Sequence, residues 1–141
     1  MDGEEKMPIK QLTVFLENQA GRLTDVAKIL KDRNINLLGF STTEARDYGI
    51  LRLVVSDVES ARQLLKESGF TTHLAEVICL EVEDKPGGLY EILDILARES
   101  VSIDYIYVIA GNRIVLSVGD ILRTEEILLE NNIKLCNSQI K

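Results

Sequence analysis

The stretch Ile9–Phe40, IKQLTVFLENQAGRLTDVAKILKDRNINLLGF, recurs at Ala75–Ile106 as AEVICLEVEDKPGGLYEILDILARESVSIDYI. Corresponding residues are separated by a constant offset of 66, as Gly21 is from Gly87. An offset that stays constant over a whole stretch indicates two copies of one structural unit. Neither copy is large enough to bury much apolar surface alone, so we expect the two to pack closely.

Each copy has the pattern strand, helix, strand, strand, helix, strand. Apolar residues alternate in the strands and recur at three- and four-residue spacing in the helices. After the turn between the second and third strands the offset falls to 63, so Asp57 and Asp120 both stand where the second helix needs an N-cap. The order βαββαβ predicts an α+β, ferredoxin-like sandwich in two tandem copies, 8–74 and 75–141, with antiparallel sheets side by side.

The second strand of each copy contains an irregularity. Its apolar residues change parity along the strand, which predicts a β-bulge near Leu38–Gly39 and another near Asp104–Tyr105. We expect each copy to end in a short fourth strand, around Phe70–Leu74 and around Ile133–Asn137.

The composition excludes several classes of function. Of the 141 residues, 45% are hydrophobic and 28% charged, which is typical of a globular protein. No apolar run is long enough to span a membrane, and the N-terminal sequence MDGEEKMP lacks the blocks of a signal peptide, so we expect a cytoplasmic protein without a membrane partner. The net charge is −7 and the basic residues are scattered, which argues against direct nucleic-acid binding.

The cysteines indicate neither a metal nor a cofactor. Cys79 and Cys136 do not form a CxxC pair, and a single histidine completes no zinc cage with them. Both fall opposite the core face, on strands that this fold places side by side. We read both thiols as reduced, and we favour cover by a dimer interface over a redox role.

The loop before the first helix of each copy carries a family resemblance. Asp84–Leu89 reads DKPGGL, whereas Asn18–Leu23 reads NQAGRL and departs from the same motif at its Asp and Pro. With βαββαβ order, this motif resembles the ACT domain, and the two copies resemble a stand-alone tandem ACT protein. The resemblance implies binding of an amino acid or similar metabolite, and regulation of amino-acid metabolism. It also implies pairs of units, with the ligand between the first loop of one and the second strand of its neighbour.

The loop chemistry suits an amino acid. A helix N-terminus presents unpaired N–H groups and a partial positive charge to a carboxylate, and a glycine at Gly21 or Gly87 leaves this backbone accessible. Asn18 and Asp84 are candidates to bind the ammonium group. The candidate ligand-binding residues are Asn18, Gln19, Ala20, Gly21, Arg22 and Leu23 in the first loop, Asp84, Lys85, Pro86, Gly87, Gly88 and Leu89 in the second, and Asn36, Leu38, Asp104 and Ile106 on the opposing wall. The alternative is that each loop is only a turn and a cap.

Two functions are consistent with these features. Because the sequence contains no matched nucleophile and base and no phosphate-binding motif, we do not expect an enzyme. The first function is an allosteric sensor that binds an amino acid between two ACT units and acts on a partner enzyme or regulator. The alternative is a ligand-independent interaction module. Phe15, Ile50 and Val54 alternate onto the outer sheet face, which favours a homodimer under either function.

Overall fold

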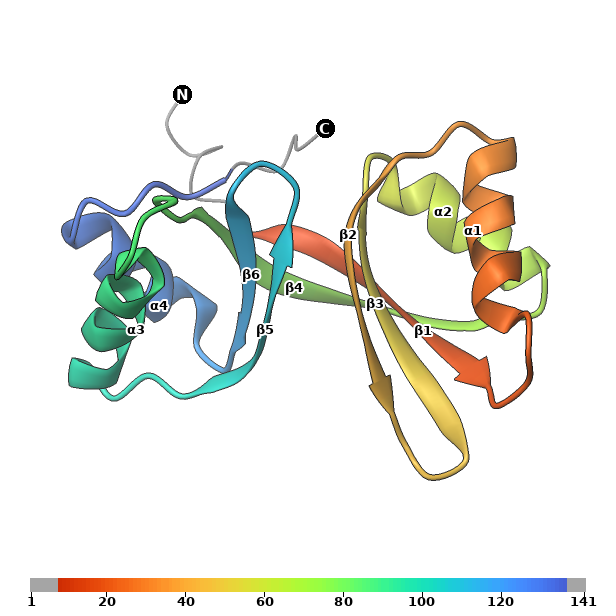
Figure 1. The fold of residues 1–141 in the computed structure, drawn as a ribbon, viewed down its shortest axis with the longest axis horizontal. Helices are drawn as coiled ribbons and strands as arrows, with labels where there is room; N and C mark the ends of the chain where they lie inside the picture. Colours follow the sequence, from red (N-terminus) through yellow and green to blue (C-terminus); the bar gives the residue numbers. More distant parts are fainter. Residues whose placement is uncertain (1–7, 137–141) are drawn as a thin grey trace. The chain divides into compact units, whose positions relative to one another are not determined.

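The structure, a computed structural model, describes residues 8–136 and divides into two compact units. The N-terminal unit comprises Lys10–Ala75, and the C-terminal unit contains the described residues from Glu76 onward. The elements in chain order are β1 (Ile9–Glu17), α1 (Arg22–Asp32), β2 (Leu37–Glu44), β3 (Tyr48–Val55), α2 (Val58–Glu67), β4 (Thr71–Glu81), α3 (Gly88–Arg98), β5 (Ile103–Ile109), β6 (Arg113–Val118) and α4 (Ile121–Glu130). The predicted α+β fold of two βαββαβ copies is confirmed, with β4 serving as the last strand of one copy and the first of the next (Figure 1).

The N-terminal unit is a sheet covered on one face by α1 and α2 (Figure 1). Its β3 pairs antiparallel with β1 and with β2. The alternating residues Leu12 and Val14 of β1 are fully buried, and they form a core with Val26 of α1 and Leu65 of α2. The alternating apolar residues of the strands and the apolar faces of the helices therefore pack into one core, as the sequence predicts.

The C-terminal unit repeats this arrangement with a weaker last strand. Its β6 pairs antiparallel with β4 and with β5. The prediction of a fourth strand around Ile133–Asn137 is wrong. Only an isolated bridge between Leu80 and Leu135 forms in the described residues, and Asn137 lies outside them. The flanking backbone bonds are those from Glu81 N–H to Lys134 and from Cys136 N–H to Cys79.

Both predicted bulges are confirmed. The pairing with the neighbouring strand shifts between Leu37 and Gly39 in β2, and between Ile103 and Tyr105 in β5. A bulge at this point lets the apolar residues on either side of it face the same core, because it restores the parity that an extra residue would otherwise invert.

The four helices within residues 8–136 end in the same way. After α1, the Ile35 N–H donates to the Leu30 carbonyl and the Asn34 N–H to that of Lys31, with Asn34 at a φ of 58°. This is a Schellman ending, in which a left-handed residue closes the helix. The left-handed residues at the ends of α2, α3 and α4 are Gly69, Ser100 and Asn132.

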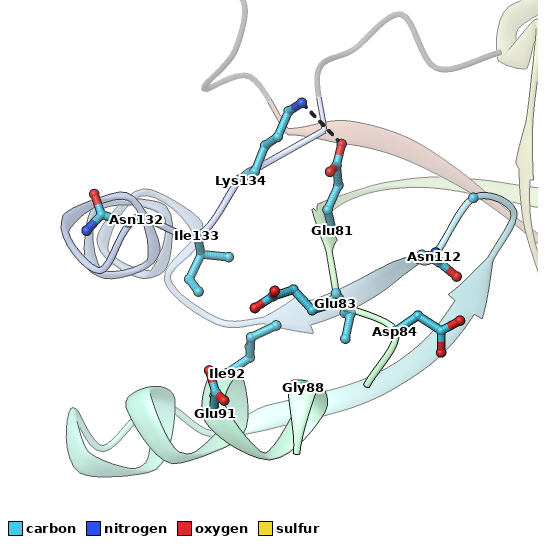
Figure 2. A pocket seen from close by; sticks show the side chains of 12 residues that line it. Glu81, Glu83, Asp84, Gly88, Glu91, Ile92, Asn112, Asn132, Ile133 and Lys134 are labelled. Atoms are coloured by element: carbon cyan, nitrogen blue, oxygen red, sulfur yellow. Dashed lines mark ion pairs between the residues drawn. The ribbon is translucent and has the colours of Figure 1, made fainter. Parts of the chain in front are cut away.

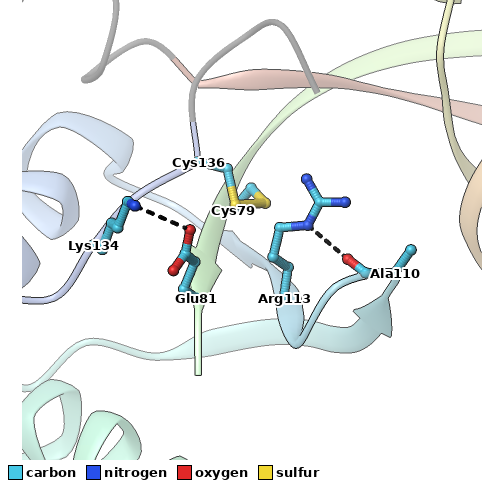
Figure 3. Close-up of a disulfide and its surroundings, with 6 residues drawn as sticks. All are labelled: Cys79, Glu81, Ala110, Arg113, Lys134 and Cys136. Carbon is cyan, nitrogen blue, oxygen red and sulfur yellow. Dashed lines mark hydrogen bonds and ion pairs between the residues drawn. A yellow bond between two sulfur atoms is a disulfide. The ribbon is translucent and has the colours of Figure 1, made fainter. Parts of the chain in front are cut away.

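The structure corrects the expected state of the cysteines. Cys79 of β4 and Cys136 after α4 are adjacent, as their strand positions predict, but they are joined by a disulfide and are not reduced thiols (Figure 3). Their Cα atoms lie 5.1 Å apart, which is within the range that a disulfide requires. The bond ties the chain after α4 to β4.

Within residues 8–136, no helix combines the length and apolarity needed to cross a membrane.

Candidate functional site

The first helix of each unit begins without a side-chain cap. Gly21 and Gly87 are the N-cap residues of α1 and α3, with φ of 90° and 85°, and a glycine has no side chain to accept a bond from the first-turn amides. By contrast, the Asp57 and Asp120 carboxylates accept hydrogen bonds at the N-termini of α2 and α4, as predicted. The Arg22 and Gly88 N–H groups already donate to the Gln19 and Lys85 carbonyls, at 3.5 and 3.0 Å, so the N–H groups left for a ligand are those that follow in the first turns of α1 and α3.

A cavity lies beside the first loop in the N-terminal unit. It has a volume of about 260 Å³, and its other wall is the β2–β3 hairpin. The predicted residues that line it are Asn18, Gln19, Gly21, Arg22 and Leu23. Ala20 lies in the exposed turn outside it. The structure therefore gathers five of the six residues of this loop around one space.

Arg22 closes one side of this loop. Its Nε lies 3.4 Å from Glu17 Oε1 and its Nη1 3.1 Å from Asp25 Oδ2. The guanidinium carbon is 4.3 Å from the centre of the Phe70 ring. A guanidinium that contacts two carboxylates and an aromatic face is held in one orientation.

The corresponding cavity of the C-terminal unit is larger, at about 370 Å³. It extends from the second loop to the chain after α4 (Figure 2). The residues that line it are Glu81, Val82, Glu83, Asp84, Gly88, Glu91, Ile92, Gly111, Asn112, Asn132, Ile133 and Lys134. Four of these are carboxylates and one is a lysine, so the cavity is acidic, with apolar surface from its isoleucines and its valine.

Glycine is required at position 88 by close packing. A Cβ atom there would overlap the Glu83 carbonyl oxygen, whereas one at Gly87 would meet nothing within 4 Å. The loop turns through bonds from the Lys85 N–H to the Glu83 carbonyl (2.9 Å) and from the Gly88 N–H to the Lys85 carbonyl (3.0 Å). Gly87 is thus needed for its backbone angle and Gly88 for space.

The candidates for the opposing wall lie away from the loop of their own unit. Asn36 precedes β2 and exchanges hydrogen bonds of 2.9 Å with Ser56 at the far end of β3. Six residues of β3 separate that end from the loop, which corresponds to about 20 Å because a strand rises about 3.3 Å per residue. Leu38 is buried at the bulge, whereas Asp104 and Ile106 are exposed on β5.

Several site residues were missed by sequence reasoning. In the second loop the predicted Asp84 and Gly88 line the cavity, but the predicted Lys85, Pro86, Gly87 and Leu89 do not. The missed carboxylates are Glu83 and Glu91, which lie 66 residues after Glu17 and Asp25. The repeat could have identified these two residues, because acidic residues recur at both positions at the same offset while Arg22 is replaced by Gly88.

The site contains no arrangement that indicates metal chemistry. Among residues 8–136, no group of three or more His, Cys, Asp or Glu side chains is placed to hold a metal ion. Lys134 pairs with Glu81 at 3.6 Å, and Lys85 lies 3.4 Å from Glu83. What the site offers is first-turn amides, carboxylates and a limited apolar surface.

Fold and site together define a class of protein: paired βαββαβ units, each with a glycine-opened helix beside a small cavity. The chain belongs to the ACT domain pair family, since the sequence model of this family matches residues 7–140.

Solved structures agree with this assignment. Protein BT0572 from Bacteroides thetaiotaomicron is 36% identical, with 94% of each chain covered and a TM-score of 0.89. The ligand-free regulatory subunit of aspartate kinase from Thermus thermophilus is 15% identical, with 91% of this chain and 93% of that chain covered and a TM-score of 0.65. The Thermus flavus regulatory subunit is 16% identical, with 88% and 90% covered and a TM-score of 0.62. No curated protein matches the sequence.

Proposed function

We propose that this chain is a non-catalytic regulatory protein that senses an amino acid or a similar small metabolite. Binding orders the loops before α1 and α3 and changes the affinity for a partner in amino-acid metabolism. The observation that carries the proposal is the contrast between helix N-termini: Asp57 and Asp120 cap α2 and α4, whereas Gly21 and Gly87 leave α1 and α3 uncapped beside cavities.

Family and fold support a regulatory role. The two Thermus proteins that share the fold are regulatory subunits of aspartate kinase. At such low identity they support the architecture of a regulator and do not identify the metabolite or the partner for this chain.

The opposing wall of the proposed site comes from another unit. Within one unit, Asn36 and the loop lie at opposite ends of the sheet, so we propose that Asn36 serves the loop of a different unit, in this chain or in a second copy. Leu38 is buried and offers a ligand little surface. For Asp104 and Ile106 we propose the same role as for Asn36. This is the placement that the ACT resemblance implies.

The test is thermal unfolding against each of the twenty amino acids at millimolar concentration. A ligand that binds only the native state raises the unfolding temperature by mass action. Gly87→Val should abolish the shift, because its side chain covers the first-turn amides. Gly69→Val is the matched control, since Gly69 has a φ of 91° and equally open surroundings, so it carries the same backbone strain and should keep the shift.

The alternative function, a ligand-independent interaction module, is favoured if every amino acid leaves the unfolding temperature unchanged. We propose a homodimer in either case, because Phe15 and Tyr48 are exposed on the outer face with ring centres 5.9 Å apart. Val54 is buried and does not extend this surface. Sedimentation equilibrium measures the dimer directly, and a monomer at micromolar concentration contradicts it.

A further inference from the structure

One position differs between the two units in a way that points to a ligand. In the N-terminal unit the Arg22 guanidinium lies between Glu17 and Asp25 and over the Phe70 ring. Arg22 is a side chain of the protein itself, so in this unit the two carboxylates are paired with the protein's own guanidinium. Its side chain is only 24% exposed.

The C-terminal unit keeps the two carboxylates but has no arginine between them. Gly88 stands at the position of Arg22, and Ile133 at that of Phe70. The two carboxylates persist as Glu83 and Glu91, and both line the cavity of about 370 Å³. Figure 2 shows the Glu83 side chain directed toward Ile133, with the Glu91 carboxylate on α3 nearby.

We propose that this cavity binds the cationic head group of a small molecule, an alkylguanidinium, in the position that the Arg22 guanidinium occupies in the other unit. Glu83 and Glu91 contact the cation, while Ile92 and Ile133 contact the alkyl chain. The volume is within the range of small-molecule sites. The inference deepens the proposed function and rests on it, because the second loop lines the same cavity.

The occupied site in the N-terminal unit makes this more than a cluster of acidic residues. Glu17 and Asp25 show that two carboxylates at these positions hold a planar cation. Gly88 has no side chain and cannot gain one without overlapping the Glu83 carbonyl oxygen, so position 88 supplies no cation to Glu83 and Glu91.

Lys85 competes for the same carboxylates. Its Nζ lies 3.4 Å from Glu83 Oε1 and 3.9 Å from Glu91 Oε2, and all three side chains are about half exposed or more. Exposed ion pairs of this kind contribute little free energy, so a ligand that makes closer contacts displaces the lysine. Lys134, which lines the cavity, is paired with Glu81 at 3.6 Å.

Isothermal titration calorimetry with agmatine, L-arginine and L-citrulline tests the proposal. Agmatine has the guanidinium but no carboxylate, and citrulline is a neutral analogue of arginine. We expect agmatine and arginine to bind with one site per chain and citrulline not to bind. Glu91→Gln should raise the agmatine Kd about tenfold, the loss expected for one charge-assisted contact. Lys85→Gln should lower the Kd, because it removes the competing ammonium.

The N-terminal unit provides the controls. Asp25→Asn changes the carboxylate that corresponds to Glu91 and should leave the agmatine Kd unchanged. Arg22→Ala should add a second agmatine site by vacating the equivalent space. Equal binding of arginine and citrulline, agmatine binding that Glu91→Gln does not weaken, or no saturation at tens of millimolar each overturns the proposal.

The outcomes also separate this inference from the proposed function. If neutral amino acids raise the unfolding temperature while agmatine does not bind, the cation site is wrong and the amino-acid sensor stands. If agmatine and arginine bind equally well, Gly87→Val weakens neither and no other amino acid raises the unfolding temperature, the cation site stands and the amino-acid sensor is wrong.

Discussion

The N-terminal and C-terminal units have the same fold but differ in how they fill the space beside the loop. In the first, Arg22 lines a cavity of about 260 Å³ and pairs with Glu17 and Asp25. In the second, Gly88 leaves a cavity lined by the equivalent carboxylates. The two units therefore share a core but differ beside the loop: an arginine side chain lines the cavity of the first, and a glycine stands at that position in the second.

The two units also differ in how their last segment is held. In the C-terminal unit the chain after α4 makes an isolated bridge at Leu135, and the Cys79–Cys136 disulfide fastens it to β4. The corresponding residues of the N-terminal unit are Thr13 and His73, which cannot form a covalent link. The cross-link compensates for a strand that is barely formed.

The largest expected effect is loss of this cross-link. The cysteines are 57 residues apart, and a closed loop of that length stabilises the folded state by about 4 kcal/mol in the chain-entropy model. The Cys79→Ala, Cys136→Ala double variant should lose about that free energy of unfolding in urea titrations. Reductant should destabilise the wild type similarly and leave the variant unchanged. Equal wild-type midpoints with and without complete reduction would contradict this.

Thiol trapping in intact cells extends the same comparison. We propose that the protein resides in the cytoplasm, where disulfides are rare and are commonly transient. Alkylation before lysis should then find a fraction of Cys79 and Cys136 in the reduced form, whereas a fully oxidised pair points to an oxidising compartment.

A smaller but still large effect is expected at Gly88. Gly88→Ala places a Cβ against the Glu83 carbonyl oxygen, and a backbone atom cannot move aside as a side chain end can. We expect a loss of about 3 kcal/mol in the free energy of unfolding, at the upper end of the range for overpacking. Gly119→Ala is the control, because its added methyl would meet nothing within 4 Å. A Gly88→Ala variant as stable as this control would show that the loop has room for a side chain.

The architecture was predictable because it depends on local signals. Alternation and helical spacing set the elements, the parity changes located both bulges, and Asp57 and Asp120 were recognisable as caps. Each of these is decided by residues within a few positions of one another along the chain.

The site was only partly predictable because it joins distant segments. Arg22 meets Phe70, and the cavity of the C-terminal unit joins the second loop to Ile133, so its walls could not be found from either segment alone. The disulfide failed for a different reason. Strand order predicted that Cys79 and Cys136 are neighbours, but neighbouring positions do not determine whether two thiols are oxidised.

The smallest effect concerns one helix position that carries opposite charges in the two units. Glu125 of α4 corresponds to Arg62 of α2 and is only 4% exposed. Burial, and then the nearby Glu76 carboxylate, raise the pKa of Glu125 above its ordinary value of 4.5. Between these two pKa values the folded state binds more protons than the unfolded state, so the contribution of this group to stability falls as pH rises.

Glu125→Gln removes the charge and should be more stable than the wild type at pH 7, with the difference vanishing below pH 4.5. Urea titrations across this range measure it, with the exposed neighbour substitution Glu126→Gln as the control. If Glu125→Gln remains more stable than the wild type by the same free energy of unfolding in acid, the difference in stability comes from packing and not from charge.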